Sequence, residues 1–126
     1  MNKRNQINDV CIRQKVAYVS LPQNNPFNNF DSSASHGAAL NYVWKNIVQP
    51  SVQIKYIMFL DYDIFPADKF NVAAILQDKP FYGLVQERGH KWYLWPGFCC
   101  YNKQAVSFEK MNFLPNEWGD TGASNF

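Results

Sequence analysis

The sequence predicts an α/β fold in which a mixed, mainly parallel sheet is flanked by helices. The first observation is the continuous apolar run at residues 55–60, which is typical of a parallel strand buried on both faces. The second is that helical patterns precede and follow this run, at residues 36–48 and 67–76. Such alternation implies right-handed crossovers between parallel strands. The length suits one compact domain, which we expect to span residues 1–126.

The first elements are a polar start and a strand. Residues 1–14 are polar and mixed, and we expect either a short helix or a disordered start there. Residues 15–21 are rich in β-branched and aromatic side chains, which predicts a strand that ends at Pro22. Residues 23–31 are dense in Asn and Pro, and this composition is typical of a loop.

The helix that follows is marked by its apolar spacing. Residues 32–35 supply candidate N-caps. Over residues 36–48 the apolar side chains recur at the spacing of one helical face, at Leu40, Val43, Trp44 and Ile47. Pro50 prevents this helix from continuing. The strand at residues 55–60 comes next, and a second helix is predicted over residues 67–76.

The C-terminal part contains short strands and turns. In chain order we expect a strand at residues 81–86, a turn at 87–90, strands at 91–94 and 98–101 separated by Pro96-Gly97, a helix at 102–109 and a polar loop at 115–126. Cys99 and Cys100 lie in an apolar run and are predicted to be core thiols, which favours a reducing compartment. With Cys11 they show neither a disulfide framework nor a zinc-binding spacing.

Composition and charge exclude several classes of function. The net charge is +2 without a basic stripe, so we expect no nucleic-acid partner. No apolar stretch reaches the ~18 residues of a membrane span, and residues 1–10 lack the apolar centre of a signal peptide. We expect a cytoplasmic protein, and peripheral membrane association stays open. The aromatic content of 17% fits a sugar- or base-binding surface, or an interface with a partner.

The feature most indicative of function is the pair of carboxylates at Asp61 and Asp63. They follow the apolar run at residues 55–60, and ligands of open α/β sheets bind beyond the carboxyl ends of the strands. Two carboxylates there favour a hard divalent cation, Mg²⁺ or Mn²⁺, which takes oxygen ligands and substrate phosphates. The pair therefore predicts a metal-bridged diphosphate site. The structural alternative is that both acids are turn or cap residues before the helix at 67–76.

Residues 33–76 resemble the GT-A glycosyltransferases, the inverting family-2 type in particular. In that family a loop with Asn or His and then Gly leads into a helix, and a strand that ends in Asp-x-Asp and a Pro follows. Here the pattern stands at residues 35–41 (Ser-His-Gly-Ala-Ala-Leu-Asn) and at residues 56–66, which end in Leu-Asp-Tyr-Asp-Ile-Phe-Pro. The resemblance extends loosely to the C-terminal end.

The resemblance implies a fold, a reaction and a set of partners. The fold would be GT-A-like (Rossmann-like) and partial, because nothing here matches the family's first nucleotide-binding strand. The reaction would be metal-assisted, inverting transfer of a sugar from a nucleotide-diphosphate sugar donor to an acceptor hydroxyl. The acceptor would be a glycan, a lipid or a protein.

The resemblance also implies roles for individual residues. Asp61 would contact the ribose or the metal, Asp63 would ligate the metal, His36 and Gly37 would lie near the nucleotide, and Trp95 and Gly97 would line the sugar pocket. For His36 an ordinary helix-start residue is an equal alternative, and core packing is the more frequent fate of a Trp. Asn41 is expected to hold the helix to neighbouring backbone.

A carboxylate late in the domain is the expected general base, because inverting members of the family use one to remove the acceptor's proton. Asp120 is the first candidate and Glu117 the second. Two residues separate these acids, whereas the family has an adjacent Glu-Asp pair. A solvated polar tail is the alternative interpretation.

Two rival functions stay open at this point. The chain could be a non-catalytic remnant or a nucleotide-binding fragment of a glycosyltransferase. It could also be another α/β enzyme that uses Asp61 and Asp63 for phosphoryl transfer, although that chemistry would need a lysine and further acids at later strand ends. Metal-dependent donor binding and turnover separate these hypotheses.

Overall fold

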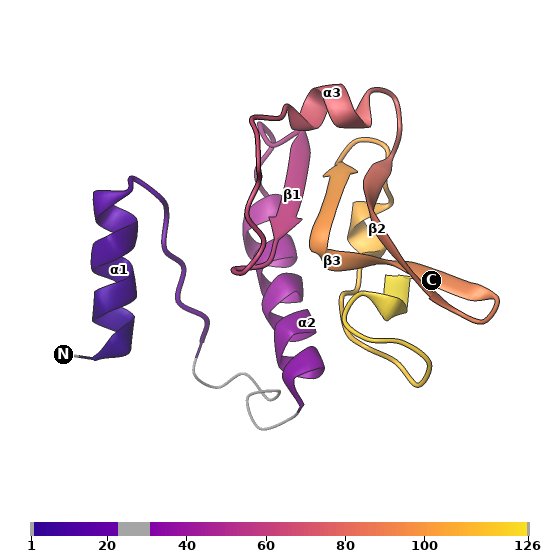
Figure 1. Cartoon of the computed structure of the whole chain (residues 1–126), viewed down its shortest axis with the longest axis horizontal. Coiled ribbons are helices and arrows are strands. Elements are labelled where there is room, and N and C mark those ends of the chain that lie inside the picture. Colours follow the sequence, from indigo (N-terminus) through magenta and orange to yellow (C-terminus); the bar gives the residue numbers. More distant parts are fainter. Residues whose placement is uncertain (1, 23–30, 126) are drawn as a thin grey trace.

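The computed structural model describes residues 2–22 and 31–125, so the predicted loop at residues 23–31 lies outside the described residues except for Asp31. Figure 1 shows the helix α1 (Lys3–Arg13) to one side, and the longer helix α2 (Ser32–Val43) lying against a sheet. At the N-terminus the helix is therefore found, rather than a disordered start. None of the α1 side chains is buried, so the core is built by the rest of the described chain.

The described residues form one three-stranded sheet of β1 (Tyr56–Leu60), β2 (Phe81–Arg88) and β3 (Lys91–Asn102), in the order β1-β3-β2. Both neighbouring pairs are antiparallel. The prediction of a GT-A-like, mainly parallel sheet flanked by helices is therefore wrong. β1 and β2 run in the same direction, because each is antiparallel to β3, but β3 lies between them and separates them.

The sheet is antiparallel because one long strand pairs with both of the others. Residues 91–94 and 98–101, which the sequence predicts as two strands, belong to a single β3 that continues through Pro96-Gly97. Pro96 is tolerated inside this strand because the register between β2 and β3 shifts at this point, and Pro96 has no paired residue in β2. The continuous strand is long enough to pair with β2 along most of its length and with β1 over its C-terminal half.

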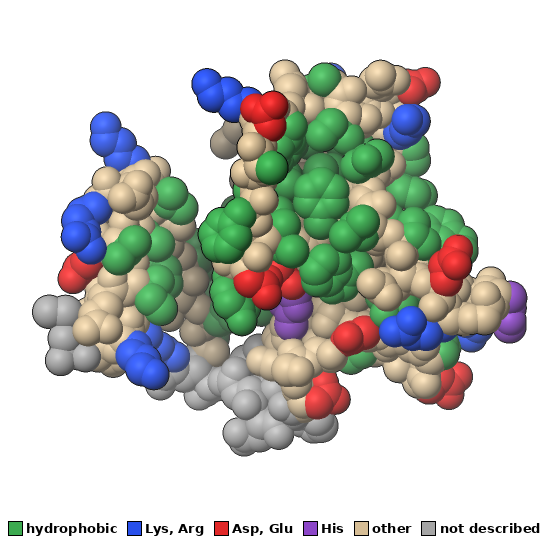
Figure 2. All heavy atoms as spheres, viewed as in Figure 1, with side chains coloured by type: hydrophobic (Ala, Val, Ile, Leu, Met, Phe, Trp, Pro, Cys, Tyr) green, Lys and Arg blue, Asp and Glu red, His purple; other side chains and the backbone are tan. Residues whose placement is uncertain are grey.

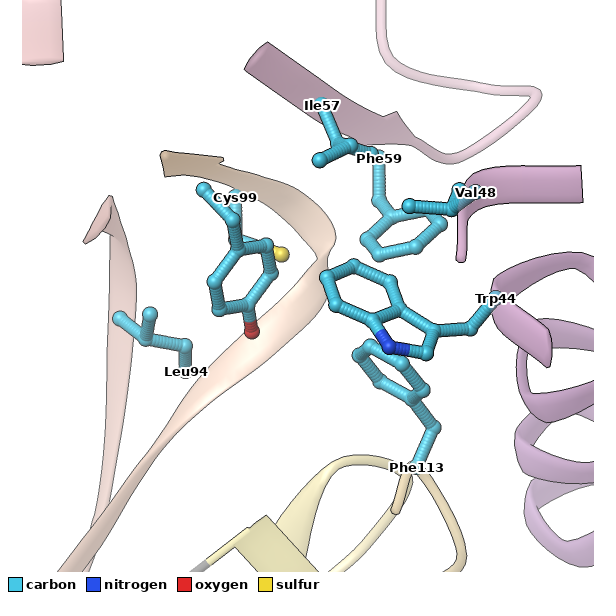
Figure 3. Packing of buried hydrophobic residues seen from close by; sticks show 8 residues of the cluster. Trp44, Val48, Ile57, Phe59, Leu94, Cys99 and Phe113 are labelled. Carbon is cyan, nitrogen blue, oxygen red and sulfur yellow. The ribbon is translucent and has the colours of Figure 1, made fainter. Parts of the chain in front are cut away.

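The core lies between α2 and the sheet. Trp44 and Val48, from the end of this helix, pack against residues of β1 and β3 and against Phe113. Figure 3 shows the Trp44 indole between the rings of Phe59 and Phe113, whose centroids lie 6.1 and 5.5 Å from it. The apolar spacing thus predicts the helix correctly, but the last turn, Trp44–Val48, is a π-helix that directly continues α2.

A buried lysine closes the C-terminal end of this helix. The ammonium of Lys103, which is 8% exposed, donates to the carbonyl oxygens of Val48 at 2.7 Å, Gln49 at 3.1 Å and Ser51 at 2.8 Å. The last carbonyls of a helix lack partners within the helix, and a positive charge there also complements the helix dipole. Lys103 therefore satisfies the helix end and links it to the end of β3.

Three other elements differ from the sequence prediction. Residues 15–21 form no strand; they have no ladder partner among the described residues, and Lys15 turns the chain after α1 with φ +57°. The second helix is shorter than predicted, because α3 (Val72–Leu76) begins only after the cap residue Asn71, whose side chain accepts from the N–H groups of the first turn. The helix predicted at residues 102–109 is absent: turns at residues 103–105 follow β3, and a 3-10 helix, Phe108–Lys110, comes after them. A second 3-10 helix, Ala123–Asn125, lies at the C-terminal end.

The thiols of β3 are buried as the sequence predicts. Cys99 and Cys100 have no exposed surface, and all three cysteines of the chain are free. Burial raises the pKa of the Cys99 thiol to about 12, so this thiol stays protonated and unreactive at neutral pH. In the described ranges, no helix has both the length and the apolar character needed to cross a bilayer.

Candidate functional site

Four segments that are far apart in the sequence meet at a shallow hollow of about 370 Å³. They are the first turns of α2, the turn after β1, the middle of β3 and the C-terminal loop. The lining residues are Ser32, Ser33, His36, Asp61, Tyr62, Trp95, Asp120 and Thr121. Figure 2 shows a histidine next to acidic side chains near the middle of the viewed face. We call this feature the carboxylate hollow, since Asp61 and Asp120 are its acidic groups.

Asp61 is fixed at the carboxyl end of β1. Its backbone N–H donates to the carbonyl oxygen of Gly97 at 2.9 Å, and its own carbonyl accepts from the N–H of Ile64 at 3.1 Å, which forms the turn after the strand. The Asp61 Oδ1 atom lies 3.7 Å from Nε2 of His36, a separation that makes an ion pair when the imidazole is protonated. Both side chains are partly exposed, at 26% and 37%, so a ligand can reach them.

Asp120 is fixed by the loop around it and by α2. The Ser33 hydroxyl donates to Asp120 Oδ1, and the N–H of Thr121 donates to the same oxygen at 2.7 Å. The N–H of Asp120 donates to the Tyr93 hydroxyl at 3.1 Å, and the Thr121 hydroxyl donates to the carbonyl of Ser33 at 3.0 Å. These bonds tie the C-terminal loop to the first turn of α2 and to β3.

These contacts set the charge of Asp120. Its pKa lies below the ordinary value, mainly because the Ser33 hydroxyl donates to the carboxylate. Partial burial opposes this effect, whereas the Thr121 N–H, the Thr121 hydroxyl and the charge of His36 add to it. Asp120 is therefore ionised at neutral pH while remaining open to solvent.

The structure gathers four of the predicted site residues and leaves four outside the lining of the hollow. His36, Asp61, Trp95 and Asp120 line it together. Asp63 is exposed on the turn next to Asp61, and Glu117 is exposed on the turn before Asp120. Gly37 and Gly97 lie beside lining residues but do not line the hollow themselves.

Both glycines serve packing. A Cβ atom at Gly37 would lie 2.4 Å from the carbonyl oxygen of Phe113, so this glycine lets α2 approach the backbone of the C-terminal loop. A Cβ atom at Gly97 would lie 2.2 Å from the Trp95 indole, so this glycine makes room for the ring. Asn41 has the structural role that the sequence predicts, because its side chain accepts from the N–H of Phe113 at 2.8 Å.

Sequence reasoning missed the hydroxyl groups of the hollow. The candidate caps at residues 32–35 are not the cap; Asp31 is, because its side chain accepts from the N–H of Ala34 at 2.8 Å. Ser33 is thereby available for Asp120. Its spacing of three residues from His36, which places both on one helical face, is a signal that could have identified it. Tyr93 and Thr121 carry no comparable signal.

The fit of a divalent cation follows from the donor set. Across residues 2–22 and 31–125, no group of three or more His, Cys, Asp and Glu side chains could hold a metal ion. Mg²⁺ and Mn²⁺ do not need such a cage, because one or two carboxylates suffice when waters and substrate phosphates complete the coordination. Asp61 could take part in such a site only together with waters and the phosphates of a ligand.

Two other hollows are distinct from this site. An apolar cavity of about 430 Å³ lies over β2, β3 and the turn after β3, with Leu94, Tyr101 and Met111 among its lining residues. A smaller hollow of about 230 Å³ at the tip of the β2–β3 hairpin is lined by His90, Lys91, Trp92 and Trp118. The acidic groups of the carboxylate hollow border neither of them.

Comparisons of this chain with protein families, with curated proteins and with solved structures found no match. The functional argument therefore rests on the geometry and chemistry of the site.

Proposed function

We propose that the carboxylate hollow binds a nucleotide-diphosphate sugar and that the chain transfers the sugar, with inversion, to an acceptor hydroxyl. The observation that carries the proposal is that Asp61, which follows the apolar strand, and Asp120, which the family resemblance suggests, lie on one hollow with His36 and Trp95. Carboxylates suit a cation-bound diphosphate, and an indole ring suits the apolar face of a sugar. The resemblance of residues 33–76 to glycosyltransferases, which suggested this reaction, lies in the sequence motifs and not in the arrangement of the sheet.

Asp61 is the proposed ligand of Mg²⁺ or Mn²⁺, with Asp63 on the adjacent turn as a second carboxylate. The cation supplies charge that stabilises the departing diphosphate. The bond from the Asp61 N–H to Gly97 fixes the backbone at the start of this turn. His36, 3.7 Å from Asp61, is placed to donate to a phosphate oxygen when it is protonated.

Asp120 is the proposed general base. The acceptor oxygen forms a bond to the anomeric carbon as its proton passes to the Asp120 carboxylate. The bond between that carbon and the phosphate oxygen breaks on the opposite face, and its electron pair leaves with the nucleoside diphosphate. The bonds from Ser33 and Thr121 both go to Oδ1, so Oδ2 is the oxygen that would accept the proton.

The partners and setting follow from the same proposal. The donor is a nucleotide sugar, and the acceptor belongs to a glycan, a lipid or a protein, with no role for nucleic acid. The proposed compartment is the cytoplasm, which keeps thiols such as Cys99 and Cys100 reduced. Peripheral contact with a membrane is compatible with this setting.

A non-catalytic donor-binding fragment is the second candidate. It is favoured by the positions of Asp63 and Glu117, because both acids are exposed outside the lining of the hollow. Such a chain would bind the donor and would not transfer the sugar. Binding and turnover must therefore be measured separately.

The test of donor binding is calorimetric titration with UDP and with GDP, with and without MnCl₂. We expect saturable binding only with the metal. Asp61→Asn should weaken it by on the order of tenfold or more, because an amide is a poorer cation ligand. Asp78→Asn is the matched control, since Asp78 is exposed after α3, which Figure 1 shows at the far end of β1 from Asp61.

Turnover is measured as release of UDP or GDP from nucleotide sugars in the presence of candidate acceptors. Asp120→Asn should lower the rate by about 10²–10⁴-fold and leave donor binding nearly unchanged. Donor binding without any turnover in the native chain would favour the second candidate. Equal metal-dependent binding by the native chain and Asp61→Asn would contradict the proposed role of Asp61.

A further inference from the structure

The tip of the β2–β3 hairpin carries an aromatic hollow that the proposed reaction does not yet use. The strands are joined by Gly89-His90, with Gly89 at φ +64°, the left-handed conformation that tight hairpin turns favour. Beside this turn lie two indole rings and two polar side chains, those of His90, Lys91, Trp92 and Trp118. We call this feature the hairpin hollow.

Trp118 is held in place from one side. Its ring meets that of Tyr93 in an edge-on contact, with centroids 6.0 Å apart, and its backbone N–H donates to the Asn116 side chain at 3.1 Å. The Lys91 ammonium lies over the indole, 4.6 Å from its centroid. Gly119 permits this packing, because a Cβ atom there would lie 2.9 Å from the Tyr93 ring. The indole is thus a pre-positioned and partly exposed surface.

The lysine indicates what the indole can bind. A cation over an aromatic face marks that face as electron-rich, and such a contact is weak when it is exposed to solvent. The apolar C–H groups on one face of a sugar ring carry a slight positive charge and pack against the same kind of surface. A sugar can therefore displace the ammonium from the ring, and Lys91 and His90 can then donate to its hydroxyl groups.

The hairpin hollow is connected to the proposed general base. Tyr93, whose ring contacts Trp118, also accepts the hydrogen bond from the Asp120 N–H at 3.1 Å. Lys91, Tyr93 and Trp95 are every second residue of β3, so they share one face of the strand. This row of side chains leads from the hairpin hollow to the carboxylate hollow. The four-residue step from Lys91 to Trp95 spans about 13 Å at the rise of a strand.

We propose that the hairpin hollow binds the sugar ring next to the reacting ring of the acceptor, and that the acceptor is therefore an oligosaccharide. This inference rests on the proposed glycosyl transfer. The hollow of about 230 Å³ is smaller than the ~300–1,000 Å³ of sites for drug-sized ligands, so it suits a single ring. Trp118 lies two residues before Asp120, so their Cα atoms are at most about 7.6 Å apart. This spacing places the reacting ring beside Asp120 and the adjoining ring of the acceptor on Trp118.

The four tryptophans give a direct readout by NMR of their indole N–H groups. Trp92 and Trp118 report on the hairpin hollow, Trp95 reports on the carboxylate hollow, and buried Trp44 is the internal reference. The probes are malto-, cello-, chito- and xylotetraose, with the corresponding monosaccharides, and separately UDP with MnCl₂. We expect at least one tetrasaccharide to shift the Trp92 and Trp118 signals, and to bind more tightly than its monosaccharide.

Variants then locate the binding. Trp118→Ala should weaken tetrasaccharide binding by on the order of tenfold to a hundredfold, the usual effect of losing a stacking ring, and leave UDP–Mn²⁺ affinity unchanged. Trp118→Phe keeps a smaller ring and should retain part of the affinity, which guards against loss of the loop's structure. Trp95→Phe, in the carboxylate hollow, is the matched control and should lower tetrasaccharide affinity much less than Trp118→Ala does.

Each outcome separates the two proposals. If UDP–Mn²⁺ shifts Trp95 but no tetrasaccharide shifts Trp118, the donor site stands and the hairpin hollow is not an acceptor site. If UDP–Mn²⁺ itself shifts Trp118 and loses affinity in Trp118→Ala, the hollow binds the donor's base, and the inference is overturned. If a tetrasaccharide binds at Trp118 but no nucleotide binds, the hollow is a sugar site and the proposed transfer is wrong.

Discussion

The two ends of α2, with the π-helical turn that continues it, differ in burial and in the kind of contacts that they make. At the C-terminal end, Trp44 and Val48 are 2% and 4% exposed and lie in the aromatic core. At the N-terminal end, Ser33 and His36 are partly exposed and line the carboxylate hollow. Apolar packing at one end thus holds polar side chains in fixed positions at the other. The site can remain open to solvent because its geometry does not depend on its own burial.

The middle of the helix connects these ends to the C-terminal loop. Gly37 lets the helix touch the backbone of Phe113, and Asn41 accepts the N–H of the same residue. The loop that follows carries Asp120, which Ser33 reaches from the first turn of α2. The positions of His36 and Asp120 relative to each other are therefore set by the packing of a single helix against a single loop.

The comparison predicts that damage to the core end is the most costly change. Trp44→Ala removes the ring that contacts Phe59, Tyr101 and Phe113, and should lower the free energy of unfolding by about 3–5 kcal/mol. Urea denaturation followed by circular dichroism measures this loss. Trp92→Ala is the control, since Trp92 is 38% exposed and its removal leaves no buried cavity of comparable size. Equal losses in the two variants would show that the core does not centre on Trp44.

A smaller effect is expected from the polar group that closes the same end of the helix. Lys103→Met keeps the length of the side chain but removes the donor to the carbonyls of Val48, Gln49 and Ser51. Leaving buried acceptors without a partner should cost about 1–3 kcal/mol in the free energy of unfolding. Lys45→Met, on the exposed side of the same turn, should cost much less. If Lys103→Met leaves the free energy of unfolding unchanged or raises it, water or other groups satisfy these carbonyls.

How far the sequence predicts the molecule depends on whether a feature is local. The apolar spacing at Leu40, Val43, Trp44 and Ile47 and the apolar run before Asp61 predict α2 and β1, because periodicity is a local property. The order of the strands is not local. The direction of β3 is set by a two-residue hairpin, and β3 lies between β1 and β2, so these two strands do not pair with each other.

The candidate site shows the same division. Asp61 was a candidate because it follows an apolar strand, and His36, Trp95 and Asp120 were candidates because of the family resemblance. Ser33 and Tyr93 were missed because their roles come from contacts between segments, which residue type alone does not reveal. The family resemblance placed both glycines near the ligand, but the close approach that each permits here is to Phe113 and to Trp95.

The smallest expected effect lies at the open end of α2 and concerns pH. Ser33→Ala removes the hydroxyl that holds the pKa of Asp120 below its ordinary value, so that pKa should rise toward the ordinary range of Asp. Because the folded-state pKa is the lowered one, its stabilising effect is present above the ordinary Asp pKa and is lost as the pH falls through the lowered value. In Ser33→Ala the two pKa values approach each other, so this stabilising effect should become smaller, and the acid limb of sugar transfer should move to higher pH.

NMR titration of the Asp120 side-chain carboxyl carbon measures this shift, with Ser32→Ala as the control from the same turn of α2. The free energy of unfolding at neutral pH should change by no more than ~0.5 kcal/mol, since the pair is open to solvent. If Ser33→Ala lowers the free energy of unfolding as much as Trp44→Ala does, the solvent-exposed N-terminal end of α2 also stabilises the fold. If the pKa of Asp120 is unchanged in Ser33→Ala, Thr121 and His36 are the groups that lower it. Ser33 would then orient the Asp120 carboxylate without changing its pKa.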